Sequence, residues 1–146
     1  MEDIYNIDRF LTAQDTFSSS YNIALNEIKN GHKSSHWIWY IFPNVKGLGQ
    51  SSQSNYYGIS CLNEAKAYLA HPVLRERLIE ISKEVLLQNE KTTVYTLMGS
   101  PVDVKKLKSC MTLFHFADPE EEVFKKVLDT YFNGYFCKKT IKILGL

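Results

Sequence analysis

The sequence predicts an all-α fold with about six helices of unequal length, in a single domain that spans residues 1–146. Apolar residues recur at spacings of three and four along most of the chain, which is the period of an amphipathic helix. Start and stop signals such as Ser100-Pro101 and Asn133-Gly134 divide the chain at helix-length intervals. No two alternating apolar runs are joined by a hairpin signal, and 146 residues suit one domain.

Two helices are expected before the aromatic middle of the chain. Their stripe positions are Ile7, Phe10, Leu11, Gln14 and Phe17 in the first helix, and Tyr21, Ala24, Leu25 and Ile28 in the second. The serine run 18–20 is expected to separate them, because serine hydroxyls compete for backbone donors and disfavour a helix interior. Asn30-Gly31 is expected to stop the second helix.

The aromatic segment from Trp37 to Phe42 contains both tryptophans of the chain. It is compatible with a short buried strand or with a helical turn, and Pro43 disfavours helix at the residue before it. From Asn44 to Ser54 the glycines, serines and glutamines show no apolar period. A long loop is therefore expected after the aromatic segment.

Helix signals continue through the second half of the chain. Ser60 is expected to cap a short helix that ends near Ala70, and His71-Pro72 is expected to open the next one. A short element follows from Val94 and is stopped by Gly99. The remaining starts are expected at Ser100-Pro101 and Asp118-Pro119, and the apolar tail at 140–144 is expected to dock as a last helical turn.

Charge and composition exclude several classes of protein. The net charge of +1 lacks the basic excess of a nucleic-acid-binding protein, so the lysine clusters are interpreted as solvated helix faces. No stretch approaches the ~20 apolar residues of a membrane span, and no secretory signal is recognisable. These features predict a cytoplasmic protein with reduced thiols. The three cysteines and four histidines have no metal-ligand spacing, so no metal site is expected.

Four candidate site residues lie in the aromatic segment or close to it in the sequence. His36 is a candidate catalytic acid-base group or an anion donor, or alternatively a structural histidine bonded to the backbone. Trp37 and Trp39 would share a face in an extended chain and are suited to stack on a purine or nicotinamide-like ring, with core packing as the alternative. Ser51 belongs to a glycine-serine loop that offers donors to an anion but lacks the P-loop lysine; a plain connection is the alternative.

The remaining candidates lie on predicted helices. Gln14 falls on an apolar stripe, so its amide is expected either to brace the His36 segment or to contact a ligand. Lys108, Thr112 and His115 line one flank of a helix and would suit a phosphate or carboxylate, unless that flank is simply solvated. Cys110 is interpreted as a small buried residue.

These residues resemble those of the domain of unknown function family 1810, an uncharacterised bacterial family, over nearly the whole chain. The most distinctive part is the run Ser35-His36-Trp37-Ile38-Trp39-Tyr40-Ile41-Phe42-Pro43. Other matching segments are Arg9-Phe10, Ala13-Gln14, Gly47-Leu48-Gly49, Tyr68–Leu74, Gly99-Ser100-Pro101, Lys108–Phe114 and Tyr131-Phe132. The resemblance implies a small helical fold and transfers no chemistry. Cys110 stands where serine is frequent in such sequences, which argues against a nucleophilic role.

Two functions remain open from the sequence. In the first, the aromatic segment walls a pocket for an anionic, nucleotide-like small molecule, with His36, Gln14, Ser51 and Lys108 as polar contacts. If that protein were an enzyme, hydrolysis or transfer at a ribosyl or phosphoryl centre would use His36 as the acid-base group and Lys108 as the charge stabiliser. In the second, the aromatic segment is a protein-protein docking surface without catalytic activity. The sequence does not identify a cofactor and leaves catalysis undecided.

Overall fold

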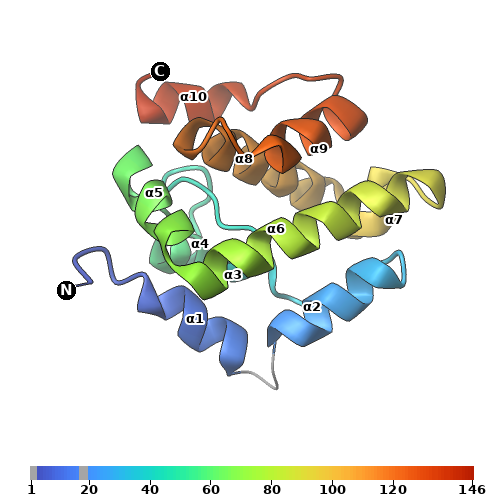
Figure 1. Ribbon diagram of the computed structural model, residues 1–146, viewed down its shortest axis with the longest axis horizontal. Coiled ribbons are helices and arrows are strands. Elements are labelled where there is room, and N and C mark those ends of the chain that lie inside the picture. Colours follow the sequence, from blue (N-terminus) through green and yellow to red (C-terminus); the bar gives the residue numbers. More distant parts are fainter. Residues whose placement is uncertain (1–2, 17–19) are drawn as a thin grey trace.

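The computed structural model describes residues 3–16 and 20–146, and its regular structure there is helical (Figure 1). The α-helices are α1 (Asp8–Asp15), α2 (Ser20–Lys29), α3 (Ile38–Ile41), α4 (Ser52–Tyr57), α5 (Leu62–Ala70), α6 (Pro72–Leu87), α7 (Val94–Met98), α8 (Pro101–Ala117), α9 (Glu122–Phe132) and α10 (Lys138–Leu144). A 3-10 turn, η1 (Gln88–Glu90), follows α6. Within the described ranges no β-strand forms, and one isolated bridge joins Val45 and Ile59.

The all-α prediction is confirmed for the described residues, but the expected number of about six helices is wrong, because ten are present there. Helices α3 and α4 have four and six residues, so they are too short for a period of 3.6 to register in the sequence. Helices α7 and α10 are expected from the sequence only as a short element and as a last helical turn. Helix α4 begins inside the segment that was expected to be loop. Phe17 and residues 18–19 of the serine run lie outside the described residues.

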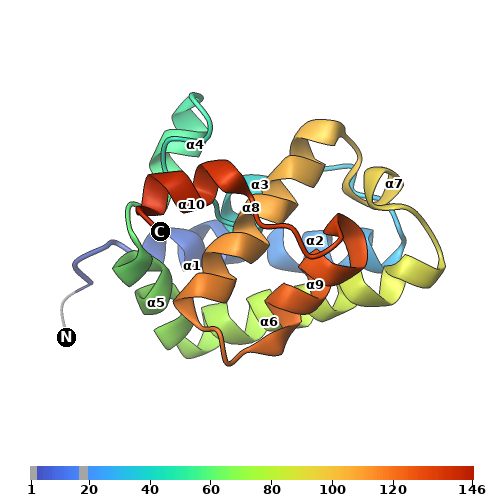
Figure 2. The same cartoon turned by 90° about the horizontal axis from the view of Figure 1, so that it is seen from above.

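Helix α8 is central to the packing. It packs against α5, α7, α9 and α10, and nine of its residues are buried. Figure 1 shows α8, α9 and α10 above α6, with α1 and α2 below it. Figure 2, which looks down on the first of these layers, shows α10 packed beside α8 with the two helix axes at an angle. One face of α8 therefore packs into the core, and the neighbouring face packs against α10.

The start of α8 follows the predicted signal and positions the aromatic segment. Ser100 Oγ accepts a hydrogen bond of 3.2 Å from the backbone N–H of Asp103, as an N-cap does. Gly99 ends α7 at φ +85°, and a Cβ there would come within 2.7 Å of the Lys33 carbonyl oxygen. The Lys33 N–H donates to the Leu97 carbonyl at 2.7 Å. The chain that leads into Trp37 is thus fixed against the α7–α8 corner.

Candidate functional site

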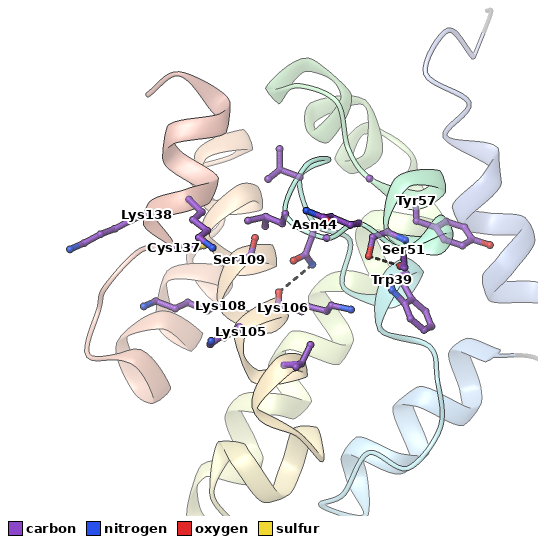
Figure 3. Close-up of a pocket in the computed structure, with 18 of the residues that line it drawn as sticks. Trp39, Asn44, Ser51, Tyr57, Lys105, Lys106, Lys108, Ser109, Cys137 and Lys138 are labelled. Atoms are coloured by element: carbon purple, nitrogen blue, oxygen red, sulfur yellow. Dashed lines mark hydrogen bonds between the residues drawn. The ribbon is translucent and has the colours of Figure 1, made fainter.

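A cavity of about 980 Å³ opens between α8, the start of α10 and the segment 44–58 (Figure 3). This volume is near the upper end of the range of about 300–1,000 Å³ that is usual for small-molecule sites. We call it the lysine cavity, because five lysines line it: Lys105, Lys106 and Lys108 on α8, and Lys138 and Lys139 on α10. Of the described residues that line it, none is Asp or Glu.

Among the described residues, none of the five lysines has a carboxylate partner. The ion pairs found within residues 3–16 and 20–146 all involve other side chains. Figure 3 shows Lys105, Lys108 and Lys138 gathered on one side, and Lys106 extending from α8 toward Trp39. Positive charges brought together without counter-charges attract anions and repel one another. The arrangement can therefore hold an anion with several negative oxygens.

Four aromatic side chains complete the wall: Trp39, Tyr57, Tyr135 and Phe136. Trp39 is partly buried, and the Lys106 Nζ lies 5.0 Å from the centre of its indole ring. The Trp39 Nε1 is buried and has no hydrogen-bond partner in the described structure. A buried donor without a partner is costly, and a ligand acceptor is one of the groups that can satisfy it. The wall therefore combines apolar area with an unused polar group.

Lys106 has the most distinctive electrostatic environment of these lysines. Burial of its side chain lowers the pKa of Lys106 below the ordinary range, Asp103 opposes that shift and Lys33 adds to it. The opposing influence of Asp103 is weakened because its Oδ2 lies 2.8 Å from the Lys33 Nζ. Burial removes water from the ammonium and disfavours it relative to the neutral amine. This is why the pKa of Lys106 is lowered and not raised.

The segment 44–58 is attached to α8 by its own polar groups. The Asn44 Nδ2 donates to the Phe42 carbonyl at 2.8 Å and to the Lys106 carbonyl at 3.3 Å. Backbone hydrogen bonds of 2.8–2.9 Å pair Lys46 with Ile59 and Ile59 with Asn44. A Cβ at Gly58 would meet Lys46 at 2.8 Å, so only glycine permits this close approach. The segment is therefore a fixed wall of the cavity.

The opposite wall is attached by buried hydroxyl groups. Ser109 and Thr140, both buried, share a hydrogen bond of 2.6 Å between α8 and α10. The Thr112 Oγ1 accepts from the backbone N–H of Cys137 at 2.9 Å and donates to the Lys108 carbonyl at 2.8 Å. Thr112 is fully buried and does not line the cavity. It holds the start of α10, and with it Lys138, at the cavity wall.

The lysine cavity brings together three of the residues selected from the sequence: Trp39, Ser51 and Lys108. Ser51 caps α4, since its Oγ accepts from the Ser54 N–H at 3.0 Å. The Lys108 Nζ lies 5.9 Å from the centre of the Phe132 ring, on the α9 side of the cavity. These residues come from three parts of the chain, and the fold brings them close together.

Other candidates lie outside the cavity. Gln14 is buried, donates to the Tyr40 carbonyl at 2.9 Å and accepts from Arg77 at 3.2 Å, so it braces α3 from within. Trp37 is 1% exposed, and its Nε1 donates to Glu27 at 3.0 Å. His36 is exposed and does not line the cavity, so its geometry offers no support for acid-base chemistry there.

His115 lies behind the cavity wall. Its ring is stacked on Phe136, with 5.4 Å between ring centres, and Phe136 does line the cavity. Burial lowers the pKa of His115, Lys125 lowers it further, and Asp129 opposes the shift. The His115 Nδ1 is buried and has no hydrogen-bond partner in the described structure. His115 thus supports the wall, and its surroundings favour the neutral imidazole over the charged form.

The sequence reasoning missed several residues that line the cavity. Lys105, Lys138 and Lys139 are exposed, as expected of solvated helix faces, but together with the half-buried Lys106 they also line the cavity, and no role is predicted for the segment 135–137. The available signal was the absence of an acid three or four residues away from most of these lysines, in contrast to Lys125 and Lys126.

Two kinds of site are not found in the described part of the chain. No group of three or more His, Cys, Asp or Glu side chains there is arranged as a metal ion would require. Among the helices of residues 3–16 and 20–146, none has both the length and the apolar content needed to cross a bilayer.

Comparison with known proteins gives a family and a fold. The family described as protein of unknown function (DUF1810) matches residues 4–144. The crystal structure of the conserved hypothetical protein Rv1873 from Mycobacterium tuberculosis is similar, with a TM-score of 0.89 and 36% sequence identity over 99% of both chains. No curated protein matches the sequence. These findings assign no activity, so the geometry has to support the functional argument.

Proposed function

The chain belongs to the DUF1810 family of proteins of unknown function, and from this premise we propose that it binds a small anionic molecule of the nucleotide type in the lysine cavity. The single observation that carries the proposal is the set of five lysines without a carboxylate in one cavity. Cations that are gathered without a counter-charge repel one another, and this repulsion destabilises the compact state. A bound anion supplies that counter-charge.

The aromatic wall supports the nucleotide-like part of the proposal. Trp39 and Tyr57 flank the side of the cavity that faces away from Lys108 and Lys138 (Figure 3). Aromatic faces bind planar rings, while ammonium groups bind phosphate or carboxylate oxygens. A molecule with a ring at one end and anionic groups at the other matches this division. Free thiols at Cys61, Cys110 and Cys137 agree with a cytoplasmic location.

Calorimetric titration with ATP, AMP and inorganic pyrophosphate at low salt tests the proposal. We expect ATP and pyrophosphate to bind with a Kd of about 1 mM or tighter, and AMP to bind more weakly because it carries fewer charges. Tryptophan fluorescence adds a local readout, since Trp39 lines the cavity and Trp37 is buried outside it. The fluorescence change should disappear in Trp39→Phe. Absence of heat and of any spectral change with all three probes would refute the proposal.

A second candidate, a protein-protein interaction module, is favoured by one observation. Tyr135 and Val102 lie at the cavity and are 68% and 60% exposed. An apolar rim of this kind is suited to a partner chain. A tight complex whose formation is unaffected by saturating pyrophosphate would favour this candidate over the anion site.

A further inference from the structure

The lysine cavity carries positive charge at two separate places. Lys106 and Lys108 are two residues apart on α8, so their side chains leave the helix about 160° apart. The Lys106 Nζ lies 5.0 Å from the centre of the Trp39 ring on α3. The Lys108 Nζ lies 5.9 Å from the centre of the Phe132 ring on α9. Figure 3 shows Lys138 on the Lys108 side, and Lys106 extending toward Trp39. A compact anion can contact only one of these two places.

The Lys106 side has two donors and no anion. Asp103, about one helical turn before Lys106, is paired with Lys33 at 2.8 Å. Within residues 3–16 and 20–146 the Lys106 Nζ has no carboxylate partner, and the buried Trp39 Nε1 has no hydrogen-bond partner. A phosphate group has several acceptor oxygens and can satisfy an ammonium and an indole N–H that lie close together. The Lys106 side is therefore suited to an anionic group of its own.

The lining between the two charged sides is polar but uncharged. Asn44 lies against α8, where its Nδ2 donates to the Lys106 carbonyl at 3.3 Å. Ser51 caps α4 in the neighbouring wall, and the segment 44–58 contributes no charged side chain to the described lining. Neutral amides and hydroxyls of this kind bind the hydroxyl groups of a ligand. At about 980 Å³ the cavity has room for a molecule that reaches both sides.

We infer that the ligand of the lysine cavity is a nucleoside bisphosphate that carries one phosphate at the 5′ position and the other at the 2′ or 3′ position of the ribose. The inference rests on the proposed function and narrows its ligand class. The Lys108 side would hold the 5′-phosphate, and Lys106 with the Trp39 Nε1 would hold the second phosphate. The sugar separates the two phosphates of such a molecule, whereas the phosphates of ADP and ATP are joined directly. Lys106 is then the residue that determines specificity.

Calorimetric titration of the full chain, at low salt and without divalent cations, tests the inference. The probes are adenosine 3′,5′-bisphosphate, adenosine 2′,5′-bisphosphate, ADP and ATP. ADP has as many phosphates as either bisphosphate, and ATP has a comparable charge. We expect one of the bisphosphates to bind about tenfold more tightly than ADP and also more tightly than ATP, because it reaches both groups of lysines. If neither bisphosphate binds more tightly than both ADP and ATP, the inference is overturned.

Single substitutions separate the roles of the two sides. Lys106→Met should weaken binding of the preferred bisphosphate about tenfold and binding of ADP much less, so the ratio of the two affinities should fall close to one. Lys108→Met should weaken both ligands similarly and keep the ratio. Lys83→Met, on α6 away from the cavity, is the control for net charge and should alter neither affinity.

The ratio of affinities also distinguishes specificity from a structural role. A loss of folded protein lowers the apparent binding of both ligands together and does not change their ratio. A ratio that stays as high in Lys106→Met as in the unsubstituted chain would overturn the role of Lys106. If Lys106→Met does not fold, the ranking of the four probes with the unsubstituted chain decides.

Single-stranded RNA contains the same chemical unit, because each internal nucleotide has a phosphate on both sides of its ribose. The net charge of +1 argues against such a strand as the ligand. An adenylate hexamer should therefore bind no more tightly than the preferred free bisphosphate. Tighter binding of the hexamer would overturn the assignment to a small molecule.

Failure of this inference is distinguishable from failure of the proposed function. Binding of pyrophosphate and ADP, together with no preference for either bisphosphate, refutes the inference and leaves the anion site. Absence of binding by every probe, pyrophosphate included, refutes the proposed function, and the inference falls with it.

Discussion

Two neighbouring cavities share Gly58, but among the described residues the cation of one has hydrogen-bond and ion-pair partners and the cations of the other do not. The smaller one, of about 310 Å³, is lined by Arg9 and Glu64, and we call it the Arg9 pocket. There the guanidinium has a partner for each of its nitrogens: it donates to Glu64 at 2.7 Å and to the carbonyls of Tyr5, Asn6, Tyr56 and Gly58 at 2.7–3.1 Å. In the lysine cavity the five ammonium groups have no such partners.

The difference separates a structural charge from a charge that is free for a ligand. Arg9 and Glu64 are both at least 91% buried, so each needs the counter-charge of the other in addition to its other hydrogen bonds. Lys33 and Asp103 form a second pair of this kind at 2.8 Å. The cavity lysines have no such partner among the described residues, and Lys105, Lys138 and Lys139 are exposed to solvent instead. Substitutions should therefore affect folding in the first region and binding in the second.

The largest effect is expected from Glu64→Gln in the Arg9 pocket. The substitution leaves a buried guanidinium without its counter-charge, so the free energy of unfolding should fall by about 3–5 kcal/mol. Urea unfolding followed by circular dichroism measures it. Glu76→Gln, at an exposed position of α6, is the matched control and should change stability by less than about 0.5 kcal/mol. Equal stability of the two variants would contradict the structural role of the pair.

The next effect is expected on binding, from the pair Lys108→Met and Lys138→Met. Each lost ammonium should weaken pyrophosphate binding about tenfold, so the double variant should lose about 100-fold in affinity. Its free energy of unfolding should stay the same or rise, because repulsion within the cavity falls. The control double variant, Lys83→Met with Lys126→Met, removes the same charge away from the cavity. Parallel losses in both double variants would show that net charge alone attracts the anion.

Helix signals that depend on neighbouring residues could be predicted from the sequence, and those that depend on tertiary contacts could not. Ser100, Pro101 and Asp103 form the start of α8 as predicted, because a capping hydrogen bond needs only residues three apart. Helix α4 has no buried residue, so no apolar stripe could reveal it. Tertiary neighbours decide whether such short segments become helical.

The site was only partly predictable for a similar reason. Trp37 and Trp39 would share a face in a strand, but the chain turns into α3 after Trp37, so residues two apart point in very different directions. Trp37 is therefore buried and Trp39 reaches the cavity. Thr112 was placed on a ligand-facing flank, and α10, a helix seen in the sequence only as an apolar tail, covers it.

A smaller effect is expected from Glu27, a carboxylate that the fold satisfies without a paired cation. Burial alone would raise its pKa, but hydrogen bonds from Ser35, Ser34 and Trp37 lower the pKa to about 2 from its ordinary 4.5. A folded pKa below the unfolded one stabilises the protein above pH 4.5, and this stability is lost as the pH falls toward 2. Glu27→Gln should cost about 1 kcal/mol at pH 7, allowing for its partial exposure.

Urea midpoints of Glu27→Gln and the unsubstituted chain, measured between neutral and strongly acidic pH, test this linkage. The difference between them should be constant above pH 4.5 and shrink toward zero near pH 2. Asp129→Asn, whose carboxylate pairs with Lys125 on the surface of α9, should show a much smaller difference throughout. A difference that does not change with pH would mean that Glu27 acts through packing.

The smallest effect is expected from salt, and it discriminates most directly between satisfied and unsatisfied charges. Raising KCl from about 0.02 M to about 0.5 M screens repulsion among exposed charges but hardly affects buried pairs. The unsubstituted chain should therefore gain a few tenths of a kcal/mol of unfolding free energy, because several lysines repel one another across the cavity. The double variant of Lys108 and Lys138 should gain less, and the double variant of Lys83 and Lys126 as much as the unsubstituted chain. If all three proteins respond alike, the cavity lysines do not repel one another, and the need for a bound anion that we derive from their repulsion falls with it.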